Sequence, residues 1–195
     1  PDPMALMIGG EGLLGVVTEA WVRLTPVPKA VETALAAFPT IRNATQAVAG
    51  ILAAGVVPAA LEMMDKNILG ALNAAFGLTY PEGTAALLLV ECDGEPGAPT
   101  REMAEVQAIC QSEQCLSFVT AQNEDERKQL WTARKKGIGA MGRLAPSIVT
   151  HDGVIPPSKL PEMLEFVYEV AAEAGVGIAN LFHAGDGNLH PCFYF

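Results

Sequence analysis

The chain has 195 residues, of which 50% are hydrophobic and 17% are charged, so we expect a folded domain with a sizeable core rather than a disordered segment. Its net charge of −10, with only 12 lysines and arginines, argues against a nucleic-acid-binding surface, which needs clustered positive charge. No apolar run approaches the roughly 20 residues of a membrane span, and we expect a cytoplasmic protein.

The first 27 residues differ in pattern from the rest. They contain a glycine-rich turn, Gly9-Gly10-Glu11-Gly12-Leu13-Leu14-Gly15, and then an alternation from Val17 to Arg23 that predicts a strand. The stretch Thr25-Pro26-Val27-Pro28 ends this segment, because two prolines in four residues fit neither a helix nor a central strand. We therefore expect a linker there.

From Lys29 onward, strands and helices alternate. Apolar residues at every second position predict strands, and one-sided apolar faces with polar caps predict helices. The elements expected in the first part are a strand at 31–37, a helix from Thr40 to Gly55, a strand at 59–63, a helix from Asp65 to Gly77, a strand at 84–92, a helix at 100–113 and a strand at 116–121.

The pattern continues to the end of the chain. The elements expected there are a helix opened by Asn123, a loop of small residues at 137–146, a strand at 148–155, a helix capped by Ser158 and closed by Gly175, and strands at 178–182 and 191–195. The last two strands form a hairpin, which argues against an all-parallel sheet. We therefore predict an α+β fold with a mostly antiparallel sheet and helices on one face.

The segment His183-Ala184-Gly185-Asp186-Gly187-Asn188-Leu189-His190-Pro191 is the strongest candidate site. Its glycines, with Asp186 and Asn188, tolerate the positive φ of a tight turn, which places His183 and His190 on neighbouring strands where their imidazoles can converge. Such a pair can bind zinc or a similar divalent ion, or serve as a general base near neutral pH.

Spacing alone also allows a plain glycine turn between two partly buried histidines. Two of the chain's three histidines nevertheless fall in this window. A metal site needs at least three protein ligands. Asp186 stands at the turn tip and no other carboxylate is obviously placed, so the metal site is incomplete as it stands.

Other polar residues stand in apolar surroundings. Arg134 follows Trp131 by three positions on one helical face and could grip a substrate carboxylate, although a solvated basic helix end is the alternative, which fits Lys135 and Lys136 better. Glu62 lies in an apolar strand, and a buried carboxylate needs a partner, so its role is open.

Three features have more ordinary interpretations. His151 and Asp152 are adjacent on a predicted strand and should face opposite ways. The four cysteines form no CxxC pair, which is typical of reduced structural thiols in a cytosolic protein. On composition alone the glycine-rich stretch Gly9–Thr18 is also an ordinary turn, although such a turn can bring backbone N–H groups close to a phosphate or a flavin ring.

Five segments in order resemble the FAD-linked oxidase family, whose flavin domain is of the vanillyl-alcohol-oxidase type. Within that family they resemble the FAD-linked subunit of glycolate oxidase and the D-lactate and D-2-hydroxyglutarate dehydrogenases. The segments are Gly9–Glu19, Pro58–Asp65, Leu130–Arg134, Asp152–Pro156 and His183–Pro191, and they span nearly the whole chain.

The resemblance implies that residues 1–27 are the tail of an FAD-binding domain and that residues 28–195 are the ferredoxin-like substrate (cap) domain, truncated at its C-terminus. It implies an enzyme that oxidises a 2-hydroxy acid to the 2-oxo acid while FAD takes the hydride. Arg134 matches the arginine that grips the substrate carboxylate, and His183 and His190 match a pair that holds a divalent metal in some members. The residues expected to contact the flavin are Gly9, Gly10, Glu11, Gly12, Gly15, Val16 and Val17.

The partners implied are a small 2-hydroxy acid, the missing FAD-binding domain, and further subunits or an electron acceptor. The chain departs from the family pattern at Gly10 and Leu13, where Ser and Thr are usual, and at Pro157, where a basic residue is common. Two alternatives remain: a non-redox flavoenzyme on the same scaffold, such as the ether-lipid synthase, and a free-standing α+β metal-binding or interaction module without catalysis.

Overall fold

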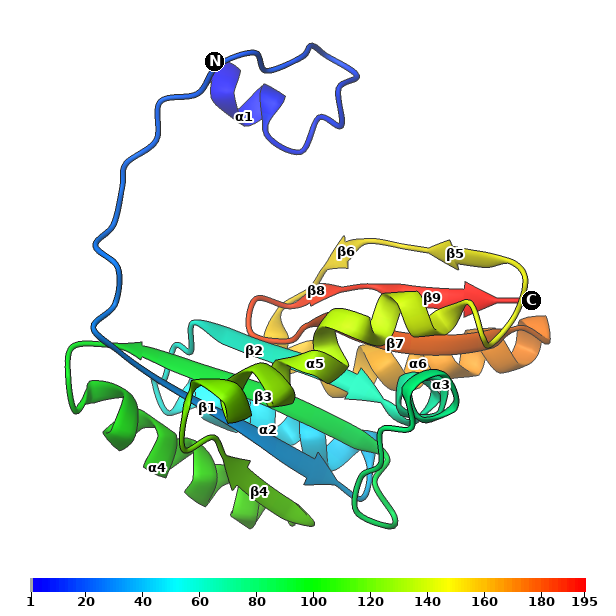
Figure 1. Ribbon diagram of the computed structural model, residues 1–195. Coiled ribbons are helices and arrows are strands. Elements are labelled where there is room, and N and C mark those ends of the chain that lie inside the picture. Colours follow the sequence, from blue (N-terminus) through cyan, green and yellow to red (C-terminus); the bar gives the residue numbers. More distant parts are fainter. Residues whose placement is uncertain (1) are drawn as a thin grey trace.

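The computed structural model describes residues 2–195 (Figure 1). Its helices are α1 (Pro3–Met7), α2 (Ile41–Ala53), α3 (Lys66–Phe76), α4 (Ala98–Ser112), α5 (Glu124–Met141) and α6 (Leu160–Ala174), with a 3-10 turn at Pro157–Lys159. Its strands are β1 (Ala30–Phe38), β2 (Ala60–Asp65), β3 (Ala86–Gly94), β4 (Ser117–Thr120), β5 (Ile148–Thr150), β6 (Gly153–Val154), β7 (Gly177–His183), β8 (Asn188–Leu189) and β9 (Pro191–Tyr194).

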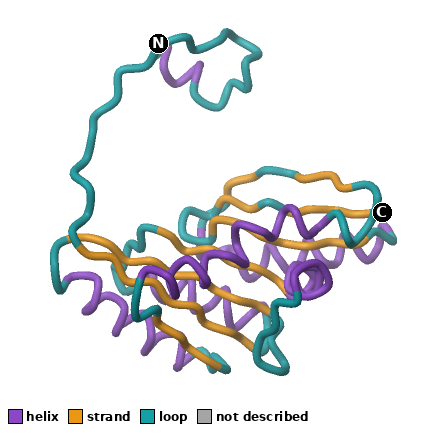
Figure 2. The backbone as a smooth tube through the Cα atoms, viewed as in Figure 1, coloured by secondary structure: helices purple, strands orange, loops and turns teal. Residues whose placement is uncertain are grey.

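The strands form one antiparallel sheet in the order β4-β1-β3-β2-β7-β8-β6, and β9 pairs with both β7 and β5. Figure 2 shows the long central strands crossed by helices and the short strands β5 and β6 running over β8 and β9. The predicted α+β, ferredoxin-like class with a mostly antiparallel sheet is confirmed.

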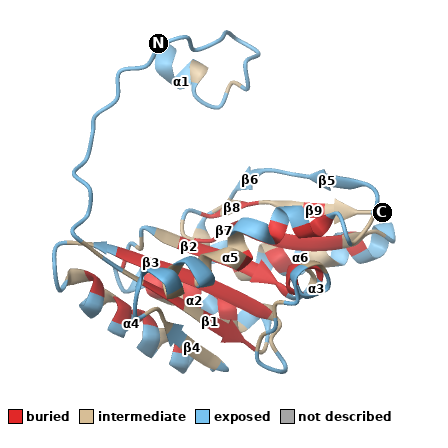
Figure 3. Cartoon of the chain, viewed as in Figure 1, coloured by how far each residue is buried: buried red, intermediate tan, exposed pale blue. Residues whose placement is uncertain are grey.

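Helices cover both faces of the sheet, whereas we expected them on one face. Helices α2, α4 and α6 pack on one face, and α3 and α5 pack on the other. The cause is visible in β3, where consecutive residues are buried: Leu88 joins the first core and Leu87 joins the second. A strand with apolar side chains on both faces must be covered on both. Figure 3 shows the buried residues concentrated in these central strands.

Local signals place the helix ends as expected. The Thr40 hydroxyl accepts a hydrogen bond from the Asn43 amide at 3.0 Å, and Asn123 caps α5 by accepting from the amides of Asp125 and Glu126. Helices α3 and α6 both end at a glycine in the left-handed region, Gly77 and Gly175. These contacts satisfy backbone groups that a helix terminus leaves without intrahelical partners.

Three local expectations were wrong. The small residues from Gly137 onward do not begin a loop, because α5 runs on to Met141. Gly137 instead lets α5 approach the sheet, since a Cβ there would lie 2.1 Å from Leu181 Cδ1. Ser158 lies inside the 3-10 turn and makes no capping bond, and the expected strand at 148–155 is split into β5 and β6.

The segment before β1 stands apart from the domain (Figure 1). The glycine-rich turn forms as expected, with Gly9 and Gly12 at positive φ. The predicted strand from Val17 to Arg23 does not form, because a strand needs a neighbour for its hydrogen bonds and this stretch has none in the structure. Its apolar side chains are exposed to solvent, and Trp21 is fully exposed. None of the helices described here has the length and apolar character to cross a membrane.

Candidate functional site

Glu62 and His183 are directly opposite each other on the neighbouring antiparallel strands β2 and β7. Directly opposed residues project their side chains from the same face of the sheet. Here Oε1 of Glu62 lies 2.7 Å from Nδ1 of His183. The carboxylate is buried, while the imidazole is 44% exposed and so remains accessible from outside.

Helix α5 supplies the second partner of Glu62. Nε of Arg134 donates to Oε2 of Glu62 at 2.6 Å, and both side chains are largely buried. This contact answers the question that the sequence left open, because it gives the buried carboxylate its counter-charge. Within residues 2–195 the Arg134 guanidinium donates from Nε alone, so its two Nη groups remain available.

The closing turn brings the two histidines together as expected. The rings of His183 and His190 lie edge to face with centroids 5.3 Å apart. Asp186 does not join them: it is exposed, and its Oδ1 accepts from the Asn188 amide at 3.0 Å, which closes the turn. Oδ1 of Asn188 is buried without a hydrogen-bond partner in the described chain.

His190 has a carboxylate of its own, because Nδ1 of His190 lies 3.4 Å from Oδ1 of Asp152. The sequence did not predict this contact. In the sequence Asp152 stands out only as the neighbour of His151, whose ring packs edge-on against Phe193. Asp152 falls at the break between β5 and β6, and the strand pattern gave no sign of that break.

The two histidines suit a divalent metal in kind but do not complete a site. Each has Nδ1 beside a carboxylate, which leaves Nε2 free, and this is the arrangement in which metal-binding histidines are usually held. Across residues 2–195, however, no three His, Cys, Asp or Glu side chains gather closely enough to hold an ion. The chain therefore offers two donors of a set that needs at least three.

A cavity of about 210 Å³ opens beside Glu62 and His183. Residues Val57–Leu61 and Leu52 give it an apolar wall, while Gly185 and Asp186 form its rim near the closing turn. This volume is below the usual range for drug-sized ligands, about 300–1,000 Å³, and suits a smaller molecule.

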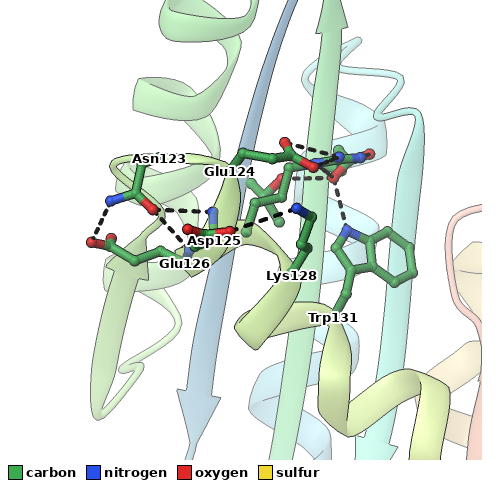
Figure 4. A network of polar contacts seen from close by, with 9 residues as sticks. Asn123, Glu124, Asp125, Glu126, Lys128 and Trp131 are labelled. Carbon is green, nitrogen blue, oxygen red and sulfur yellow. Dashed lines mark hydrogen bonds and ion pairs between the residues drawn. The ribbon is translucent and has the colours of Figure 1, made fainter.

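A second buried carboxylate, Glu91 on β3, anchors the N-terminal half of α5. It accepts two hydrogen bonds of 2.8 Å from Arg127, one of 2.8 Å from Nε1 of Trp131 and one of 2.6 Å from the Thr33 hydroxyl. Figure 4 shows Trp131 on α5, with a dashed line for the hydrogen bond that its indole nitrogen donates. Burial acts to raise the pKa of Glu91, but the donors, Arg127 above all, outweigh it and hold the pKa below its usual value.

A third carboxylate, Asp65, joins β2 to β7 below the site. It caps α3 through the amides of Asn67 and Ile68, and it also accepts from the Tyr168 hydroxyl and from the amide and side chain of Asn180. Burial raises the pKa of Asp65 in spite of these donors. The predicted cap is confirmed, and the same side chain ties together the strands that carry Glu62 and His183.

The structure thus brings together three of the predicted site residues, His183, His190 and Arg134, with Glu62 as the link. It does not bring the predicted flavin-binding stretch Gly9–Val17 to them, because that turn lies on the separate N-terminal segment (Figure 1).

A family model described as FAD linked oxidases, C-terminal domain, matches residues 27–195. The chain belongs to this family. It is 38% identical over 190 residues to the glycolate oxidase subunit GlcD of Bacillus subtilis, covering 97% of the chain and 40% of that protein. It is 32% identical to the mitochondrial D-lactate dehydrogenase (cytochrome) of Arabidopsis thaliana, covering 100% of the chain and 34% of that protein.

Solved structures agree on the fold. An alkyldihydroxyacetonephosphate synthase matches 97% of this chain and 41% of its own with a TM-score of 0.67 and 16% identity. A substrate-bound p-cresol methylhydroxylase matches 87% of this chain and 39% of its own with a TM-score of 0.59 and 10% identity. The chain spans about 40% of the length of these proteins and of the glycolate oxidase subunits.

Proposed function

We propose that the protein containing this chain is an FAD-dependent dehydrogenase or oxidase of small 2-hydroxy acids, such as glycolate or D-lactate. The observation that carries the proposal is the cluster in which Glu62 links Arg134 and His183 beside a small cavity. The identity of 38% to glycolate oxidase subunits supports the same substrate class.

Arg134 and His183 would have different roles in this reaction. The Nη groups of Arg134 can donate two parallel hydrogen bonds to the carboxylate of the acid. Nε2 of His183 can accept the hydroxyl proton as a general base, because Nδ1 is already engaged by Glu62. FAD, when bound, supplies the acceptor for the hydride that leaves the 2-carbon.

The N-terminal segment fits the flavin side of this proposal. The side chains of Leu13, Val16 and Val17 are exposed, as expected for a surface that another domain covers. We propose that residues 1–27 are the tail of the FAD-binding domain and that residues 28–195 are the substrate domain. The contacts from Gly9–Val17 to the flavin are part of this proposal.

The metal remains a proposal of the same kind. Where a divalent ion such as zinc is bound, Nε2 of His183 and Nε2 of His190 would be two of its ligands, and the ion would then replace His183 as the general base by lowering the pKa of a bound substrate hydroxyl. The unpartnered Oδ1 of Asn188 next to them supports a further polar group in this place. Four free cysteines, without a disulfide, support a cytoplasmic location.

The test is steady-state activity of the full-length protein with an artificial electron acceptor and a panel of glycolate, D-lactate, L-lactate and D-2-hydroxyglutarate. We expect a yellow protein that reduces the acceptor with glycolate or one of the D-acids, and no turnover from residues 1–195 alone. A colourless full-length protein, or one inert to the whole panel, would overturn the proposal.

A further inference from the structure

Glu62 uses each of its oxygens for a different partner. Oε1 faces Nδ1 of His183 at 2.7 Å and Oε2 accepts from Nε of Arg134 at 2.6 Å. The two partners come from elements far apart in the chain, β7 and α5, and only the fold brings them to one carboxylate. Glu62 therefore decides the orientation of both side chains at once.

For His183 the contact selects a tautomer. A carboxylate beside a guanidinium is ionised and can only accept hydrogen bonds, so Nδ1 of the imidazole must carry the proton that is shared with Oε1. The neutral ring then has its lone pair on Nε2, on the opposite side from Glu62. Without such a partner, a histidine in water prefers the other tautomer, with the proton on Nε2.

For Arg134 the contact selects an edge of the guanidinium. Nε is used by Glu62, and neither Nη group donates to any residue from 2 to 195. A guanidinium offers two edges for bidentate binding, and the one formed by the two Nη groups stays free. Arg134 therefore pairs with Glu62 through Nε, and its two Nη groups can still bind a second carboxylate.

We propose that Glu62 is a positioning residue, which fixes His183 as the Nδ1-protonated tautomer and presents the Nη edge of Arg134 to the site. The role assigned to the two partners rests on the proposed function, but the tautomer does not. It depends only on the contact between Glu62 and His183.

Glu91 shows what a buried carboxylate with a purely structural role looks like in the same molecule. Glu91 is also a buried carboxylate on a neighbouring strand, and it also holds α5 through an arginine, Arg127. In the part of the chain that the structure describes, its hydrogen-bond partners all hold the fold, including Trp131 and Thr33, and none is a histidine. Glu91→Gln is therefore the matched control for Glu62→Gln and Glu62→Ala.

The decisive experiment is NMR of the chain labelled with ¹⁵N-histidine, recorded at about pH 8.5, where an ordinary imidazole is neutral. Only three histidines are present, and His183→Gln and His190→Gln identify their signals. We expect the two-bond ¹⁵N–¹H pattern of an Nδ1-protonated ring for His183 in the wild-type chain. In Glu62→Ala we expect the Nε2-protonated pattern, and in Glu91→Gln we expect the wild-type pattern.

The wild-type spectrum decides the matter even if Glu62→Ala fails to fold. An Nε2-protonated His183 in the wild-type chain would overturn the proposal, and so would an unchanged tautomer in a folded Glu62→Ala. The His151 ring packs edge-on against Phe193, so an unshifted His151 signal reports that the variant keeps this packing and is folded.

The full-length enzyme gives the second readout. We expect Glu62→Gln to lower kcat/KM by about 10–100-fold, the effect that is typical when the outer-shell partner of a metal-binding histidine is removed, while FAD stays bound. Glu91→Gln should change it less than threefold. If the wild-type enzyme is active and the two variants behave alike, the positioning role fails. If the wild-type enzyme is inactive, the proposed function fails, and the NMR result alone decides the role of Glu62.

Discussion

Glu62 and His183 face each other across β2 and β7, with the carboxylate oxygen 2.7 Å from Nδ1 of the ring. Arg134 approaches the same carboxylate from α5, over the sheet. The buried carboxylate of Glu62 thus connects β2, β7 and α5 beside the cavity. The fold therefore assembles a polar cluster beside the cavity from residues of three different elements.

Arg134→Lys should impair substrate binding in the full-length enzyme, because an ammonium cannot offer the flat pair of donors that a carboxylate needs. We expect kcat/KM to fall about 100-fold, which corresponds to about 3 kcal/mol for charge-assisted hydrogen bonds. Arg127→Lys on the same helix is the control, since the partners of Arg127 within residues 2–195 are only Glu91 and Glu124. Equal losses in both variants would show that Arg134 only holds the helix.

Gly187→Ala should disturb the closing turn. Gly187 has φ of +75°, and a Cβ there would lie 1.9 Å from the carbonyl oxygen of Ile155, which is rigid backbone. We expect a loss of about 3 kcal/mol in the free energy of unfolding, measured by urea titration. Gly153→Ala, in the neighbouring strand β6, has open space around its Cβ and should change it by less than about 0.5 kcal/mol. A stable Gly187→Ala chain would mean that the turn is not packed under Ile155.

Asp65→Ala should be among the most destabilising single substitutions. It would leave the amides of Ile68 and Asn180 and the hydroxyl of Tyr168 buried without their acceptor. We expect about 3 kcal/mol or more to be lost from the free energy of unfolding. Asp125→Ala, an exposed position on α5, serves as the comparison. A loss below about 1 kcal/mol for Asp65→Ala would contradict the network described.

The pH dependence of the free energy of unfolding should show how much the ionised Glu91 side chain contributes. Its pKa is held below the usual 4.5, so its contribution is fully present above that value and is lost as the pH falls through the lower folded pKa. The difference in urea midpoint between wild type and Glu91→Gln should therefore be constant from about pH 7 to about pH 5 and shrink at lower pH. A difference that grew on acidification would contradict the ion pair with Arg127.

The buried cysteine thiols should not react with thiol reagents in the folded chain. Burial raises the pKa of Cys92 and of Cys110 to about 12, and both side chains are fully buried. At about pH 8 we expect DTNB to react with Cys115, which is half-buried, and with the others only after unfolding. Cys115→Ser should abolish the reaction of the folded chain. Rapid reaction of Cys92 or Cys110 in the folded chain would contradict their placement in the core.

The sequence was informative wherever structure depends on near neighbours. Asp65 caps α3, Gly77 and Gly175 end their helices, and the turn around Gly187 brings His183 and His190 together, all as their local patterns predicted. Each of these features involves residues within about eight positions of one another, so the relevant physics is contained in one short window.

Contacts between distant segments could not be read in this way. Glu62 is 72 residues from Arg134 and 121 from His183, so its isolation in an apolar strand indicated a partner but not which one. The glycine at 137 looked like a loop residue, whereas it allows α5 to pack against Leu181. The domain boundary at residue 27 and the flavin contacts of Gly9–Val17 remain predictions.

We propose that the full-length protein passes a hydride from a 2-hydroxy acid to FAD. The most direct measurement is the visible absorbance of the purified full-length protein after anaerobic mixing with glycolate or D-lactate. We predict that the flavin band bleaches within seconds in the wild-type protein and that Arg134→Lys slows this bleaching strongly. A flavin band that stays unchanged with every 2-hydroxy acid tested would contradict the account.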